Sequence, residues 1–166
     1  MALTEHCYSV LLVSASDKLT ASLRAMLPCD RYDPVVVAGD VASARRCLLE
    51  NPFDLLLINT PLPDDFGTHL ALDVCNSSGT GVLLLVRAES YPDISARVAP
   101  YGILVLSKPT NSAILTQSLT LCCATRDRLR RMEEKAATME EKMEEIRLVN
   151  RSKWILIDQL KMTEKE

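Results

Sequence analysis

The architecture of this chain follows most directly from Phe53-Asp54-Leu55-Leu56-Leu57-Ile58-Asn59-Thr60-Pro61. Within these residues, Leu55 to Ile58 is a continuous apolar run, which is typical of a strand buried on both faces. Pro52 ends the helical pattern before the run, and Pro61 lies in the loop that begins at Asn59. A strand of this kind belongs inside a parallel sheet that has helices on both sides.

Four further apolar segments flank this strand in the sequence, and short amphipathic helices alternate with them. We predict strands at residues 8–13, 34–38, 55–58, 82–86 and 103–106, and helices at residues 17–26, 41–48, 69–75 and 90–98. This alternation favours a flavodoxin-like, doubly wound α/β fold, a five-stranded parallel sheet of strand order 2-1-3-4-5. In such folds the functional residues gather in the loops beyond the carboxyl ends of the strands.

A long helical pattern follows, from about Thr110 to Lys161, without Gly or Pro. Its seven-residue repeat places apolar side chains at the a and d positions from Leu129 to Ile146, as in a coiled-coil seam. The predicted dimer seam consists of Leu129, Met132, Ala136, Met139, Met143, Ile146 and Asn150. Asn150 is a polar a residue of the kind that fixes the register of two strands. Roughly fifty helical residues span about 75 Å, more than a small domain can cover, so we expect a second chain to cover them.

The charges beside the seam indicate the direction of that second chain. In a parallel pair, two of the three facing g and e positions attract and the third repels; they are Arg128–Glu133, Lys135–Glu140 and Lys142–Arg147. We therefore predict a parallel homodimer with a long C-terminal coiled-coil helix. The alternative is a single charged helix that packs on its own domain.

Composition limits the class of protein. The 166 residues contain 48% hydrophobic side chains and carry a net charge of −3, which suits one domain with an extension and excludes a broad basic surface for nucleic acid. No apolar run approaches the length of a membrane span and no signal sequence is present, so we expect a cytoplasmic protein without a membrane contact. The six cysteines lack metal-like spacing, and we expect small, mostly buried, reduced residues. No loop combines a nucleophile, a base and an orienting group, so we do not expect an enzyme.

Two segments carry a family resemblance. Phe53 to Gly67 closely resembles the third strand and following loop of response-regulator receiver domains, and Ser107-Lys108-Pro109 resembles the Lys-Pro after their fifth strand. The resemblance covers roughly Tyr8 to Thr125. It implies a phosphoryl-accepting aspartate after strand three, an acidic pair that holds magnesium, and a Ser or Thr and a lysine that contact the phosphate. It also implies a cis peptide bond before Pro109.

Only the lysine of that pattern is kept here, and the pocket would consist of Ser14, Ala15, Asn59, Arg87 and Lys108. Asn59 stands in the acceptor position, and an amide is no useful nucleophile toward a phosphoryl donor. Ser14 and Ala15 replace the acidic pair, so we expect neither Mg²⁺ nor another cofactor. Arg87 takes the Ser/Thr position. We interpret the domain as a degenerate, non-phosphorylated pseudo-receiver.

The C-terminal third resembles the start of an ANTAR module, the RNA-binding output of AmiR/NasR-type transcription antiterminators. The matching residues are Ser152-Lys153, Ile155-Leu156 and Thr163-Glu164-Lys165-Glu166, although Ser152 and Trp154 stand where alanine and glycine are usual. The sequence stops where the second helix of that module would begin. We expect either a trimmed chain or a protein that has lost its RNA-binding end. Candidate contacts to an RNA hairpin are Arg147, Arg151, Lys153, Lys161 and Lys165; the alternative is ordinary solvated charges.

These patterns divide the chain into three predicted parts. They are a receiver-like domain at residues 1–122, a coiled-coil dimerisation helix at residues 123–148 and an incomplete ANTAR module at residues 149–166. The leading hypothesis is a dimeric signal-transduction response regulator of the antiterminator type, in which a degenerate receiver docks a regulatory protein and controls an RNA-binding output. The alternative is a protein–protein interaction and dimerisation module without RNA binding in this chain.

Overall fold

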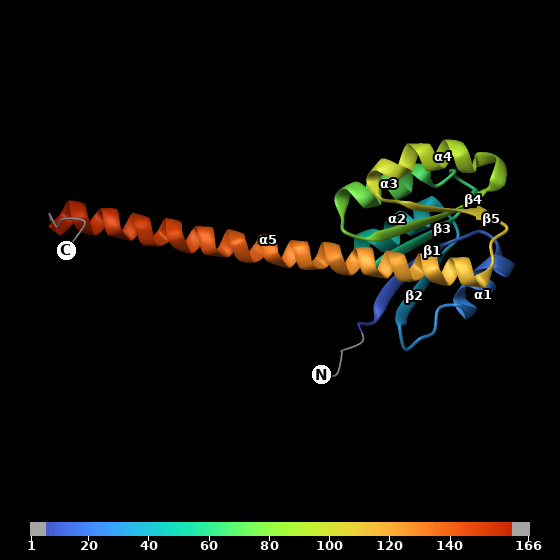
Figure 1. Cartoon of the computed structure of the whole chain (residues 1–166), viewed down its shortest axis with the longest axis horizontal. Helices are drawn as coiled ribbons and strands as arrows, with labels where there is room; N and C mark the ends of the chain where they lie inside the picture. The colour runs from blue at the N-terminus through green and yellow to red at the C-terminus, as the bar shows by residue number, and fades with distance from the viewer. Residues whose placement is uncertain (1–5, 161–166) are drawn as a thin grey trace. The chain divides into compact units, whose positions relative to one another are not determined.

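Five parallel strands form one sheet in the computed structural model, which describes residues 6–160. The strands are β1 (Tyr8–Val13), β2 (Tyr32–Ala38), β3 (Leu55–Asn59), β4 (Gly81–Arg87) and β5 (Leu104–Lys108). Their order is β2-β1-β3-β4-β5, which confirms the predicted flavodoxin-like sheet (Figure 1). All five residues of β3 are buried, as expected for a strand inside a covered parallel sheet.

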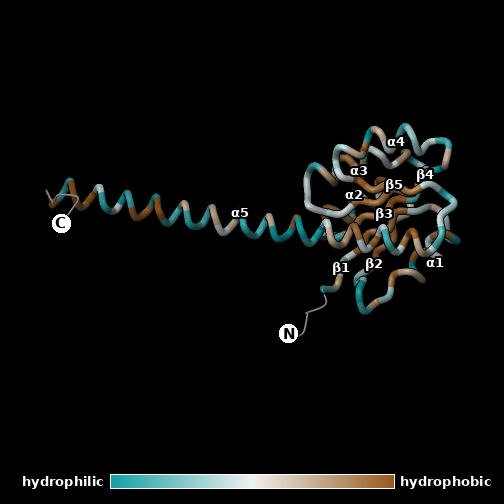
Figure 2. The backbone as a smooth tube through the Cα atoms, viewed as in Figure 1, coloured by the Kyte–Doolittle hydropathy of each residue, from teal (hydrophilic) through white to brown (hydrophobic). Residues whose placement is uncertain are grey.

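Helices cover both faces of this sheet (Figure 1). They are α1 (Asp17–Ala25), α2 (Val41–Glu50), α3 (Thr68–Ser77), α4 (Tyr91–Val98) and α5 (Ser112–Leu160), with 3₁₀ turns η1 (Ala88–Ser90) and η2 (Ala99–Tyr101). Successive strand residues point to opposite faces: Leu56 and Ile58 pack with α2, α3 and α4, whereas Leu55 and Leu57 pack with α1 and α5. The apolar strands therefore supply two cores, and Figure 2 shows them as the most hydrophobic part of the chain.

Polar side chains cap the amino ends of three helices. The Ser16 side chain accepts a hydrogen bond from the backbone N–H of Leu19, and Asp40 accepts one from Ser43 at the start of α2. Asn111 does the same for Ile114 at the start of α5. Each cap satisfies a backbone donor that has no partner within the helix, so these boundaries follow from local sequence.

The chain forms two compact units, with the boundary between Asp127 and Arg128. In the first unit, the buried residues of α5 are Leu115, Leu119, Cys122 and Cys123, which pack against the sheet. The second unit contains the rest of α5. The division into a receiver, a coiled coil and an ANTAR start stays a prediction.

The expectation that most cysteines are buried is wrong. Cys122 and Cys123 are buried, whereas Cys7 and Cys29 are exposed and Cys47 and Cys75 are half-buried. Cys7 precedes β1 and Cys29 follows α1, so neither lies on a core-facing position of an element. Across residues 6–160, no helix has both the length and the apolar character that a membrane crossing requires.

Candidate functional site

The predicted pocket residues lie at one edge of the sheet. Ser14 follows β1, and Asn59, Arg87 and Lys108 are the last residues of β3, β4 and β5. Because the strands are parallel, their carboxyl ends meet at the same edge. Arg87 also lies in register with Lys108 on the neighbouring strand. The structure thus brings four of the five predicted residues to one sheet edge, and Ala15 is exposed beside Ser14.

Asn59 is the centre of a hydrogen-bond network. Its side chain is 6% exposed, and its Nδ2 donates to Ser14 Oγ at 3.2 Å. Lys108 Nζ donates to Asn59 Oδ1 at 2.8 Å and to the Thr60 carbonyl oxygen at 2.5 Å. The Lys108–Pro109 bond is cis, as the receiver resemblance implies. The lysine is therefore bound to two neutral oxygens, one of the Asn59 amide and one of the Thr60 backbone.

The charge in this network is positive. Lys108 is half-buried, and burial together with the nearby positive charge of Arg87 lowers the pKa of its ammonium group. Among the described residues, no carboxylate forms an ion pair with Lys108. The described part of this pocket therefore holds two cations, and the hydrogen-bond acceptors of Lys108 in it are both neutral.

The donor set does not fit magnesium. Mg²⁺ prefers hard anionic oxygens, whereas this pocket offers a hydroxyl, an engaged amide and an ammonium. Asp64 is close in sequence, but its carboxylate accepts hydrogen bonds from the backbone N–H groups of Val41 and Ala42 at 2.9 and 3.0 Å. The bond from Val41 is the main reason that the pKa of Asp64 is lowered. This carboxylate therefore caps the amino end of α2.

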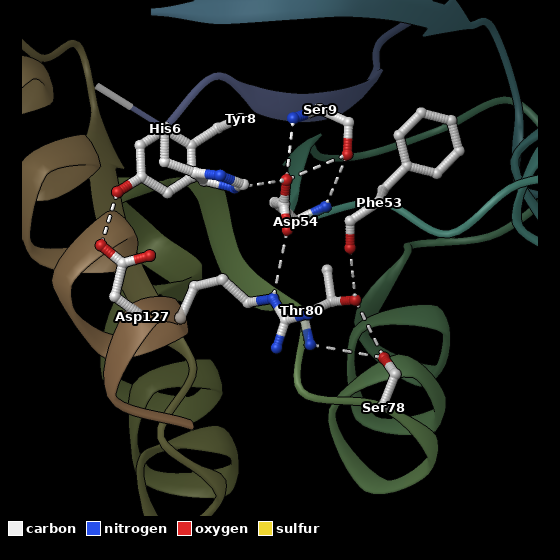
Figure 3. Close-up of polar contacts among 9 residues, drawn as sticks. His6, Tyr8, Ser9, Phe53, Asp54, Ser78, Thr80 and Asp127 are labelled. Carbon is white, nitrogen blue, oxygen red and sulfur yellow. Dashed lines mark hydrogen bonds and ion pairs between the residues drawn. The ribbon is translucent and has the colours of Figure 1, made fainter. Parts of the chain in front are cut away.

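A second polar cluster joins α5 to the amino ends of β1 and β3 (Figure 3). Asp54, directly before β3, accepts hydrogen bonds from Ser9 N at 3.0 Å and from Ser9 Oγ at 3.3 Å. Arg126 Nε of α5 donates to the same carboxylate at 3.3 Å, and His6 Nε2 lies 3.5 Å from it. We call His6, Tyr8, Ser9, Asp54, Arg126 and Asp127 the α5-root cluster.

Tyr8 makes the second link in the α5-root cluster. Its hydroxyl donates to Asp127 Oδ2 at 2.6 Å, and burial, followed by this hydrogen bond, raises the pKa of Tyr8. Arg126 and Asp127 are consecutive residues, so two neighbouring side chains of α5 are held where the first compact unit ends. Sequence reasoning missed this cluster, because the side chains that bond to one another in it are 45 to 119 positions apart and form no local motif.

The predicted seam residues are exposed in the single chain. Leu129, Met132, Met139, Met143 and Ile146 are large apolar side chains between 37% and 65% exposed, and Ala136 and Asn150 are exposed as well. In Figure 2, hydrophobic segments recur along this part of α5 among hydrophilic ones. A regularly spaced apolar row of this kind normally marks an interaction surface.

Three of the predicted RNA contacts lie in the described part of α5. Arg147, Arg151 and Lys153 are exposed, and Arg147 lies 3.7 Å from the carboxylate of Glu144. Lys161 and Lys165 lie outside the described residues. Trp154 is 70% exposed one residue beyond Lys153. This end of α5 therefore presents both cations and a large aromatic surface.

Comparisons with known proteins show which sequences and structures this chain is similar to. No protein-family model matches the chain. It is 26% identical over 156 residues to the transcriptional regulatory protein PdtaR of Mycobacterium tuberculosis, covering 93% of this chain and 76% of that protein.

Similar solved structures include the signal receiver domain of an HD domain-containing protein from Pseudomonas fluorescens Pf-5, with a TM-score of 0.68 and 22% identity over 79% of this chain and 96% of that one. The adenylate cyclase structure from Rhodopirellula baltica has a TM-score of 0.72 and 18% identity over 80% of this chain and 98% of that one. The chemotaxis response regulator CheY4 of Vibrio cholerae has a TM-score of 0.61 and 22% identity over 70% of this chain and 99% of that one. The chain thus has the fold of a response-regulator receiver domain.

Proposed function

We propose that this chain is a dimeric response regulator of the antiterminator type, whose degenerate receiver works without phosphorylation and controls an RNA-binding output. The observation that carries this proposal is the network around Asn59. An amide bound by Lys108 and Ser14 stands where a receiver needs a free carboxylate. Input then comes from a regulatory protein that docks on the receiver.

The exposed row on α5 supports a parallel homodimer. Its apolar side chains recur with the coiled-coil period, and among the described residues of the second unit no other element covers the helix. Two side-by-side output modules gain affinity for a double RNA site through effective concentration. The resemblance of residues 149–166 to an ANTAR module, together with exposed Arg147, Arg151 and Lys153, supports RNA as the target.

The proposal is tested with a seam variant. Met139 occupies a d position and Ala137 occupies the neighbouring b position of the same repeat. Met139→Glu places a charge in the seam and should give monomers in sedimentation equilibrium, whereas Ala137→Glu should remain dimeric. In a gel-shift titration with tandem RNA hairpins, the full-length wild type and Ala137→Glu should bind tightly and Met139→Glu weakly.

Two results of this experiment separate the alternatives. If all three proteins bind the RNA equally well, dimerisation does not serve RNA recognition and the proposed mechanism is wrong. If the wild type is dimeric but shows no RNA affinity even when residues that complete the ANTAR module are added after Glu166, the chain is an interaction and dimerisation module, the second function that the exposed seam supports.

A further inference from the structure

A cavity of about 490 Å³ lies between α1 and the beginning of α5. Its walls are largely apolar and include Leu19, Leu23 and Met26 of α1, Leu85 of β4 and Leu115 of α5. Small-molecule sites usually enclose 300–1,000 Å³ and combine apolar walls with a few polar groups. In its size and its lining, this cavity matches a site for a small ligand.

Lys108 is the charged residue in the described lining of this cavity. Two of its three N–H groups are used by Asn59 Oδ1 and the Thr60 carbonyl oxygen, which are both neutral. Arg87, its register partner on β4, adds a second positive charge nearby. A half-buried ammonium with neutral partners and a cationic neighbour favours an anion as its third partner.

We propose that this cavity binds a small apolar molecule that carries one carboxylate, with the carboxylate bound by Lys108. The apolar walls accept the hydrocarbon part and the lysine compensates the charge of the head group. This site depends neither on the dimer nor on RNA, so it goes beyond the proposed function. Because Lys108 also holds Asn59 and Thr60, a bound carboxylate would act directly on the network that stands in place of the phosphorylation site.

The test uses octanoate and its uncharged analogue 1-octanol as probes. Isothermal titration calorimetry on the full chain should show saturable binding of octanoate with one site per chain, and binding of 1-octanol at least about tenfold weaker, because the charge-assisted bond is lost. Lys108→Met keeps the aliphatic stem and removes the charge. It should weaken octanoate at least about tenfold and leave 1-octanol unchanged.

Matched variants exclude trivial explanations. Lys18→Met removes an exposed lysine of α1 that does not line the cavity, and it should bind octanoate like the wild type. Ser22 lines the cavity from the surface of α1, so Ser22→Trp should fill it and abolish binding of both probes. Lys108→Arg keeps a cation and should retain preference for octanoate, which covers the case in which Lys108→Met fails to fold.

Equal affinity of the wild type for octanoate and 1-octanol would overturn the proposal, as would octanoate binding that survives Ser22→Trp. Absence of saturable octanoate binding would overturn it too. If the wild type does not bind octanoate but binds a peptide helix in the cavity, the cavity is a docking site for a protein partner and the proposal is equally wrong.

Discussion

Removal of the Asp54 carboxylate should destabilise the first compact unit far more than removal of an exposed carboxylate. Asp54 accepts two hydrogen bonds from Ser9 and one from Arg126, and the Asp54 and Arg126 side chains are only 15% and 17% exposed. The matched comparison is Arg45–Asp73 between α2 and α3. That pair is shorter, at 2.7 Å, but its side chains are 48% and 58% exposed.

The expected magnitudes follow from this difference in burial. Breaking a buried ion pair by removing one partner costs about 3–5 kcal/mol, because the other partner is left without compensation. Since Asp54 and Arg126 retain some contact with water, we expect the lower end, about 3 kcal/mol, for Asp54→Ala. An exposed pair contributes about 0–1 kcal/mol, so Asp73→Ala should change little despite its shorter distance.

Urea unfolding of the full chain measures both values. All proteins should be compared at one concentration, because dimerisation links stability to concentration. Double-mutant cycles with Arg126→Ala and Arg45→Ala then isolate each pair, and the Asp54 cycle should give a coupling above about 1 kcal/mol. The reasoning is that burial, and not distance, sets the strength of the α5-root cluster. Equal losses in the free energy of unfolding for Asp54→Ala and Asp73→Ala would refute it, and so would zero coupling energy between Asp54 and Arg126.

Further consequences can be measured separately. Incubation with acetyl phosphate and Mg²⁺ should add no phosphate to the wild type by mass spectrometry, because Asn59 is an amide; an added phosphate would show that another carboxylate accepts it. Asn150→Leu should tighten the dimer in sedimentation equilibrium but allow other registers or oligomers, and unchanged affinity would remove Asn150 from the seam. Burial raises the pKa of Tyr32 from 10.0 to about 12, so its phenol contributes stability that is fully present below pH 10.0 and lost as the pH rises through 12. Tyr32→Phe should therefore reduce the loss of stability across that alkaline window, measured by urea unfolding at stepped pH; an identical profile would contradict the raised pKa. Cys7 should react rapidly with a thiol reagent in the native protein, whereas Cys122, whose pKa burial raises to about 12, should react only after unfolding.

The elements and their order could be predicted because they depend on local patterns. Leu55 to Ile58 is apolar at every position, which favours a short strand covered on both faces, and the structure places it inside the sheet. The pocket residues could be predicted for a related reason. Once the strands are parallel, Asn59 and Lys108 at their carboxyl ends must share an edge.

Other features depend on distances that no local pattern encodes. Asp54 meets Ser9 and Arg126 across 45 and 72 positions, and each residue alone resembles an ordinary surface side chain in the sequence. The prediction that most of the cysteines are buried is wrong for Cys7 and Cys29, because residue type indicates only average burial. The cavity beside Lys108 likewise exists only because α1 and α5 lie on the same face of the sheet. The periodicity of the sequence determined which faces of the helices and strands are buried. Tertiary packing decided the hydrogen-bond partners and the cavity, because only folding brings residues that are distant in sequence within bonding range.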